Sequence, residues 1–546
     1  MSETMKAIGA TAIDRRDLVK GAAIGAGALA AGLPGIAPLA TASAQDATPE
    51  ARVLEEGSGG TLVVDINLDP ETLDVHQTLT AATSNVVAQI FEGLVRAKPG
   101  TVEVEPALAT AWEQAADGLS WTFTLRQGVT FHDGTPFNAA AVKFAYDRQF
   151  DPENEFYPLG QWTLPSSFDF LAGTEVVDDY TVRFTLSKTF NKFLYRIGDL
   201  SIVSPDAVAK YRETFGENPV GTGPYLFQQW DKGQQVVLAR NDAWWGGTPT
   251  LDQVVFRGII EPGARTAAMV SGDVQIAIQI SAEMVQQLQG NDAYRVVSGP
   301  TGSLWFLAMN VEFPAFADLK VRQAMNYAID KDTLVSAVLT DTADIAYGPL
   351  SPAFAVYNPK VEEFFSYDPD KAKALLAEAG YQDSEIVFRV PIGDPNMLAA
   401  EEMGTVIQDN LRAVGITTTI QSAEAVTWMD EIRSPENELT EMSWNIAPIL
   451  PDDMFNGILS KASLPPGFNT SYWVDDEYEE LLAIGRTSLD EQEVADAYKR
   501  MQEIVMEQAP IVPVCHRRSL YGVSNTVHNF FAEPTGAFYL YNVWVG

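Results

Sequence analysis

The sequence predicts an α/β protein with two or three packed domains. The chain has 546 residues, which is enough for several full-sized cores. The strand-like run "TLVVDI" at 61–66 is followed by the turn-rich "NLDPETLD", and a helical pattern then runs through "SNVVAQIFEGLV" at 84–95. A strand that leads into a helix is typical of α/β folds.

Further strands and turns follow in order. The stretch "LSWTFTLRQGVTFHDGTPFNAAAVKFAYDR" predicts two strands, a turn at Asp133-Gly134 and a helix capped by Asn138. The stretch "TEVVDDYTVRFTL" at 174–186 predicts a hairpin with its turn at Asp178-Asp179.

Two later helices are strongly specified. In "VRQAMNYAID" the apolar residues lie on one helical face, which comprises Val321, Ala324, Met325, Ala328 and Ile329. In "DPDKAKALLAEAGY", Asp368 has the position of an N-cap, Pro369 opens the helix and Gly380 lies just past its end.

The N-terminal stretch predicts an export signal. A charged start with Arg15-Arg16, a Gly- and Ala-rich apolar middle and the small-residue exit "ASA" at 42–44 form the three parts of such a signal, and the arginine pair resembles a twin-arginine signal. The apolar run is a weak membrane anchor, and "GAGALA" lacks the strand and acidic residue of a dinucleotide-binding loop. We expect cleavage near Ala44, a tether over 45–58 and a soluble protein in the periplasm or outside the cell.

Composition restricts the partners. There are 73 acidic and 36 basic residues, a formal charge of -37, so nucleic acid and anionic membranes are disfavoured by repulsion. A single cysteine, Cys515, allows no internal disulfide, so stability depends on core packing.

No catalytic motif is found. The sequence has no G-x-S-x-G, no phosphate-binding G-x-x-x-x-G-K-[ST] and no H-E-x-x-H. The four histidines lack the spacing of metal ligands, so neither a metal nor a cofactor is expected. Cys515 and His516 are adjacent on a predicted strand and point to opposite faces, which favours a structural cysteine. We interpret His132, in "FHDGT", as structural too.

Long motifs give the chain a family resemblance. "YDRQFDPENEF", "NPVGTGPYLFQQW", "RNDAWWGGTPTLDQVVF" and "VRQAMNYAIDKDTLV", in that order, resemble the family 5 extracellular solute-binding proteins of ABC importers, the peptide, nickel and glutathione group. "PPGFNTSYW" is most similar to the glutathione-binding branch. The resemblance implies a two-lobed periplasmic-binding-protein fold with an extra small α/β domain, and a monomeric, non-enzymatic receptor. Such a receptor would deliver a peptide or peptide-like solute to a membrane permease.

The resemblance also implies domain boundaries. Lobe I would comprise 59–98, 216–303 and 516–546, the small domain 99–215, and lobe II 304–515. Two alternatives stay open: a metal-chelate receptor of the nickel type, and an exported peptide hydrolase.

The resemblance implies a ligand pocket. Peptide-binding relatives offer backbone groups from the loop that here includes Leu79, Thr80 and Ala81. Where dipeptide-binding relatives hold the ligand amine with an Asp three residues after a Trp, this chain has Ala447, although Asp452 or Asp453 could replace it. Where the same relatives hold the ligand carboxylate with an Arg, it has Glu401 and Glu402. A simple dipeptide is therefore disfavoured, and a cationic, longer or partly apolar ligand is expected.

Aromatic residues complete the predicted pocket. Large rings supply binding area at low entropic cost, and the candidates are Tyr157, Trp162, Trp305, Trp428 and Trp444. For each of them, packing in the core is the alternative interpretation.

Overall fold

The structure is a computed structural model that describes residues 54–77, 80–160, 168–340, 342–392, 397, 399–445, 450–533, 536 and 538–546. The predicted export signal and most of the predicted tether lie outside these residues. Among the described residues, no helix is long and apolar enough to cross a membrane.

A twelve-stranded mixed sheet runs through the fold. Its strand order is β16-β15-β17-β13-β18-β11-β1-β10-β9-β8, and β12 and β14 also pair with β18. The strands are β1 (Thr61–Asp65), β8 (Tyr225–Asp231), β9 (Gln235–Arg240), β10 (Gln253–Arg257), β11 (Ile276–Ile278), β12 (Tyr294–Pro300), β13 (Leu304–Met309), β14 (Ala343–Ile345), β15 (Ile386–Ile392), β16 (Thr418–Glu424), β17 (Leu439–Trp444) and β18 (Ile511–Ser524).

Among the described residues, three smaller sheets accompany it. One has the order β4-β5-β7-β6, with β4 at Ala109–Gln114, β5 at Ser120–Leu125, β6 at Leu171–Asp178 and β7 at Thr181–Leu186. The others pair β2 (Val95–Ala97) with β3 (Val104–Pro106) and β19 (Val527–His528) with β20 (Trp544–Val545). The antiparallel pairing of β6 with β7 confirms the predicted hairpin.

The helices fall into two sequence groups. Before β13 lie α2 (Ala81–Val87), α3 (Ala139–Phe150), α4 (Tyr157–Gly160), α5 (Phe193–Gly198), α6 (Pro205–Tyr211), α7 (Pro262–Ser271) and α8 (Ala282–Gln289). After it lie α9 (Leu319–Ala328), α10 (Lys331–Thr333), α11 (Pro369–Glu378), α12 (Ala400–Val414), α13 (Ala425–Ile432), α14 (Pro451–Leu459), α15 (Asp476–Thr487) and α16 (Glu491–Gln508).

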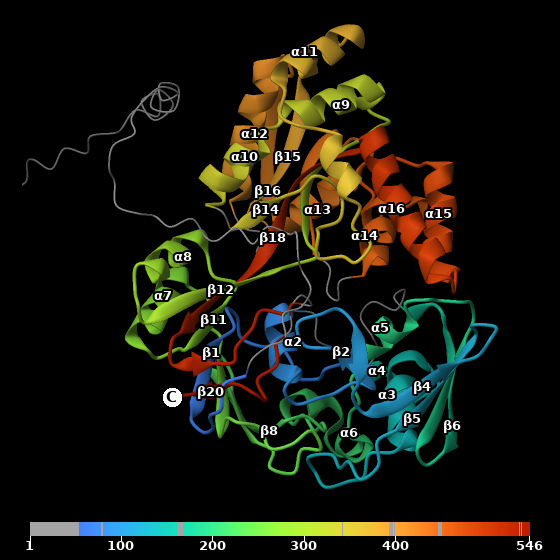
Figure 1. The fold of residues 1–546 in the computed structure, drawn as a ribbon, viewed down its shortest axis with the longest axis vertical. Helices are drawn as coiled ribbons and strands as arrows, with labels where there is room; N and C mark the ends of the chain where they lie inside the picture. Colours follow the sequence, from blue (N-terminus) through green and yellow to red (C-terminus); the bar gives the residue numbers. More distant parts are fainter. Residues whose placement is uncertain are drawn as a thin grey trace, which may run out of the picture. The chain divides into compact units, whose positions relative to one another are not determined.

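The buried apolar side chains form two large cores. All buried members of one, the lobe II core, lie between Leu304 and Cys515. The other, the lobe I core, draws on residues from Leu62 to Ile278 and from Tyr521 to Val543. The long strand β18 leaves the first core and enters the second, and Figure 1 shows it passing from beside β14 to beside β11 and β12. The exact domain boundaries stay predictions.

Local signals placed several elements correctly. Asn138 caps α3, its side chain accepting from the Ala141 N–H, and Asp368 caps α11 in the same way from the Lys371 N–H. All five residues of the predicted apolar face of α9 are buried, although Ile329 lies just past the helix end.

The helix predicted over 84–95 is wrong beyond Val87. There α2 ends, and the chain continues as turns into β2. The reason is tertiary: the Glu92 carboxylate accepts from the indole N–H groups of Trp244 and Trp245, at 3.1 and 2.8 Å. A Cβ on Gly93 would lie 2.8 Å from the Gly198 carbonyl oxygen.

Candidate functional site

The two cores are joined by two neighbouring passes of the chain. One is the short link between β12 and β13, and the other is the middle of β18. Thr301 Oγ1 in the link donates to the Arg517 carbonyl at 2.5 Å, and the imidazole Nδ1 of His516 lies 2.9 Å from the Ser303 carbonyl oxygen. Two neighbouring crossing segments of this kind can serve as a hinge between domains.

One edge of the lobe II sheet, formed by the ends of its strands, lies at this junction. β13 starts at the link, so its amino end lies there; β17 is antiparallel to β13, and β15 is parallel to both β17 and β16. The carboxyl ends of β15, β16 and β17 therefore share that edge, and α12 begins there because it connects β15 to β16. Ligands of α/β proteins bind at such an edge.

The predicted aromatic residues have different surroundings. Trp305, in β13, and Trp428, in α13, are almost fully buried in the lobe II core. Trp444 ends β17, is partly exposed and donates its indole N–H to the Asp453 carbonyl at 3.0 Å. Tyr157 is partly buried at the start of α4, and Trp162 lies outside the described residues. No ligand contact of these rings is tested, so their role stays a prediction.

The loop predicted to offer backbone groups to the ligand leads directly into α2. Thr80 is the N-cap of α2, its side chain accepting from the Thr83 N–H, and Ala81 is the first helical residue. Leu79 lies outside the described residues.

Sequence reasoning missed the residue that anchors this loop, Arg148 of α3. Its guanidinium is fully buried and makes a two-pronged ion pair with Asp74, and it also contacts His76 Nδ1 at 2.8 Å and the Leu159 carbonyl at 2.9 Å. Arg148 thereby ties the segment before α2 to α4, the two segments that hold predicted pocket residues. Burial lowers the pKa of His76 to about 4, so the ring is neutral and can accept from Arg148.

The predicted acidic residues divide into two kinds. Asp453 accepts from Arg196 of α5 at 2.6 Å, and Asp452 lies 3.1 Å from the guanidinium of Arg486. Burial raises the pKa of Asp452 to about 6 although Arg486 opposes it. Both carboxylates therefore already face arginines.

Glu401 and Glu402, in contrast, are exposed in the first turn of α12. That turn lies at the sheet edge that meets the junction, and carboxylates near a helix N-terminus are also favoured by the helix dipole. Ala447 lies outside the described residues.

Among the described residues, the cysteine and the possible metal ligands were the candidates for reactive groups. Cys515 is fully buried, and burial raises the pKa of its thiol, which keeps it protonated and unreactive. No group of three His, Cys, Asp or Glu side chains in the described part of the chain could hold a metal ion. A hollow of about 770 Å³ lies beside the β2–β3 turn, lined by Lys98, Glu105, Tyr539 and Tyr541 among others, but by none of the predicted pocket residues.

The fold, with its two cores and the sheet edge at their junction, defines a two-domain binding protein of the periplasmic type. The chain belongs to the bacterial extracellular solute-binding proteins of family 5, whose model matches residues 103–464. It is 33% identical over 478 residues to heme-binding protein A of Haemophilus influenzae, covering 83% of this chain and 86% of the relative. It is 30% identical over 493 residues to the dipeptide-binding protein of Escherichia coli, covering 86% and 91%.

A solved structure of a similar protein has the same fold. HbpA2 from Haemophilus parasuis superimposes with a TM-score of 0.82 at 29% identity, covering 89% of this chain and all of that one. The protein is thus a solute-binding receptor of the ABC-importer class, and the predicted family and fold are confirmed.

Proposed function

We propose that this receptor binds a peptide or peptide-like solute at the junction of its two lobes and, as a monomer, hands it to an ABC permease. The observation that supports this most directly is the sheet edge at the junction, where β13 begins with Trp305 near its start, β17 ends with Trp444 and α12 starts. Relatives at 30–33% identity are named for dipeptides and for heme, so both ligand classes enter the test.

We further propose that a free ligand carboxylate is disfavoured near α12. Glu401 and Glu402 supply two negative charges at the edge where dipeptide-binding relatives are expected to carry an arginine. Two unit charges about 4 Å apart interact by about 4 kcal/mol at an effective dielectric of about 20. Uncompensated, this repulsion lowers affinity several hundredfold.

Thermal unfolding with a panel of candidate solutes tests the function. The panel comprises a tripeptide, its C-terminally amidated form, glutathione, heme and nickel with histidine. We expect the amidated peptide to stabilise the protein most, by about 2.7 kcal/mol at one hundred times its Kd, with no product detected by mass spectrometry. Turnover of a bound peptide would instead support the hydrolase alternative. If only heme, or only nickel with histidine, stabilises the protein, the ligand is that solute and not a peptide.

A double variant tests the proposal about the ligand's charge. In Glu401→Gln with Glu402→Gln, the preference for the amidated peptide should shrink or vanish. If the free acid binds more tightly to the unaltered protein, or if the double variant changes neither affinity, the two glutamates do not face the ligand.

We also propose export by the twin-arginine-type segment, with a mature chain that begins near Gln45. The support is the three-part pattern around Arg15-Arg16 and Ala44. Intact-mass measurement of the exported protein checks this, and a retained arginine pair contradicts it.

A further inference from the structure

A buried glutamate in the lobe II sheet has no counter-charge for its carboxyl group within the described part of the chain. Glu441, in β17, has no exposed surface, and within the described part of the chain neither of its carboxyl oxygens has a hydrogen-bond partner and no lysine or arginine pairs with it. Buried polar groups are nearly always paired, so a complete exception calls for an explanation. The internal segments outside the described residues contain no lysine or arginine either.

Two more unpaired polar groups lie on the same face of the sheet. Trp305 is directly opposite Ser443, and Leu307 is directly opposite Glu441, in the β13–β17 ladder. Residues directly opposite share a face, as do residues two apart on one strand. The Trp305 indole N–H and the Ser443 hydroxyl are also buried without a hydrogen-bond partner among the described residues. One face therefore presents two potential donors beside a carboxyl acceptor.

Neighbouring elements cover this face without neutralising Glu441. A Cβ on Gly404 of α12 would lie 3.5 Å from a Glu441 carboxyl oxygen, so the helix packs closely over it. The Cys515 thiol, opposite Trp305 on β18, is itself made less acidic by Glu441. The buried amine of Lys331 lies near Cys515 but donates to the Ala346 carbonyl at 2.9 Å.

Burial without a counter-charge disfavours ionisation of the Glu441 carboxyl group. It raises the pKa of Glu441 well above the usual range, and the Trp305 indole opposes this only in part. A cation brought to this carboxyl would reverse the balance, because an opposite charge favours the ionised form.

The three polar groups form a row that points toward the junction of the lobes. Glu441 is fully buried, whereas Ser443, two residues nearer the carboxyl end of β17, is partly exposed, and Trp444 closes the strand. That end lies at the edge where β13 begins and α12 starts. The row thus runs from the interior to the edge at which the lobes part.

We propose that Glu441, Trp305 and Ser443 form a subsite for a cationic, N–H-rich group of the ligand, such as an amine or a guanidinium. The inference rests on the proposed receptor function and extends it to the ligand's charge. The carboxylate receives the cation, Ser443 accepts one of its N–H groups, and the Trp305 indole N–H holds the second carboxylate oxygen. On binding, the carboxyl group releases its proton to the buffer.

Matched peptides test the subsite. The probes are amidated trialanine derivatives in which lysine or norleucine replaces each alanine in turn, because norleucine keeps the aliphatic stem and lacks the amine. Calorimetry of the full protein should show at least a tenfold preference for lysine at one position. Titrations in buffers of different ionisation enthalpy should show release of about one proton per lysine peptide.

Variants then locate the effect. Glu441→Gln should abolish both the preference and the proton release, and Trp305→Phe or Ser443→Ala should weaken the preference. Glu424→Gln is the matched control, since Glu424 ends the neighbouring strand β16 but is exposed. Circular dichroism and the unfolding midpoint establish that each variant is folded.

The outcomes are distinct. Equal binding of lysine and norleucine peptides, or a preference that survives Glu441→Gln, overturns the subsite and leaves the receptor function standing. A panel in which no peptide binds at all contradicts the peptide proposal and the subsite together. A preference lost equally in Glu424→Gln assigns the effect to net charge and overturns the subsite.

Discussion

At the residue scale, the decisive interactions are buried polar clusters, and the Arg148–Asp74 pair is the most consequential. Both side chains are almost fully buried, and removing one member of such a pair leaves an uncompensated charge that costs about 3–5 kcal/mol. We expect Arg148→Met to lower the free energy of unfolding in urea by that amount and to weaken ligand binding through the loop before α2. Adding Asp74→Asn should restore part of the stability, because the stranded charge is then gone. A double variant as unstable as the sum of the single ones would contradict this coupling.

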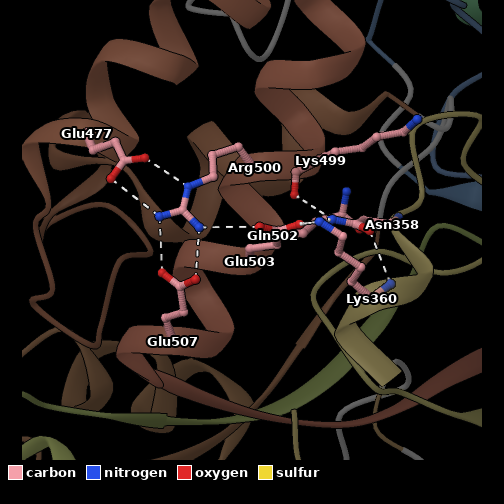
Figure 2. Close-up of polar contacts among 8 residues, drawn as sticks. All are labelled: Asn358, Lys360, Glu477, Lys499, Arg500, Gln502, Glu503 and Glu507. Atoms are coloured by element: carbon pink, nitrogen blue, oxygen red, sulfur yellow. Dashed lines mark hydrogen bonds and ion pairs between the residues drawn. The ribbon is translucent and has the colours of Figure 1, made fainter. Parts of the chain in front are cut away.

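At the element scale, α15 and α16 are linked by a surface ion network. Figure 2 shows Arg500 of α16 held by Glu477 of α15 and by Glu507, at 2.9 Å each, with Glu503 continuing to Asn358 and Lys360. Arg500 is about one-third exposed, so solvent and salt screen these pairs and each contributes little to stability. We expect Arg500→Met to lower the unfolding midpoint by only a few degrees, with a smaller loss at 1 M salt than at 0.05 M. No loss at either salt concentration would mean that the aliphatic stem, which methionine retains in length, holds the two helices rather than the charge.

At the scale of the whole molecule, α5 and the residues just before it form hydrogen bonds and an ion pair with the lobe II helices. Arg196 pairs with Asp453 at 2.6 Å, and the Asn191 side chain donates to the Gly485 and Ser488 carbonyls at 2.8 and 3.0 Å. These bonds exist only while the two parts are in contact, so they favour the arrangement in which the two parts touch. We expect Arg196→Met to raise the radius of gyration of the free protein in solution scattering and to weaken ligand binding about tenfold. Lys188→Met is the control, since Lys188 pairs with Asp169 within its own segment. If Arg196→Met binds ligand as tightly as the unaltered protein, this contact does not hold the lobes closed.

Local chemistry in the sequence by itself determined several elements of this protein. Asp368, Pro369 and Gly380 fixed the ends of α11 because caps and glycine act within a few residues, and the long motifs determined the family and its two-lobed α/β fold. Only the tertiary structure decided the rest. The chain leaves helical geometry after Val87 because Glu92 must reach Trp244 and Trp245, more than 150 residues away. Arg196 finds Asp453 across 257 positions, and Glu441, an ordinary strand glutamate in the sequence, becomes an unpaired buried carboxyl only because α12 folds over it. Such pairings depend on which surfaces the fold brings together, and no local pattern of residues carries that information.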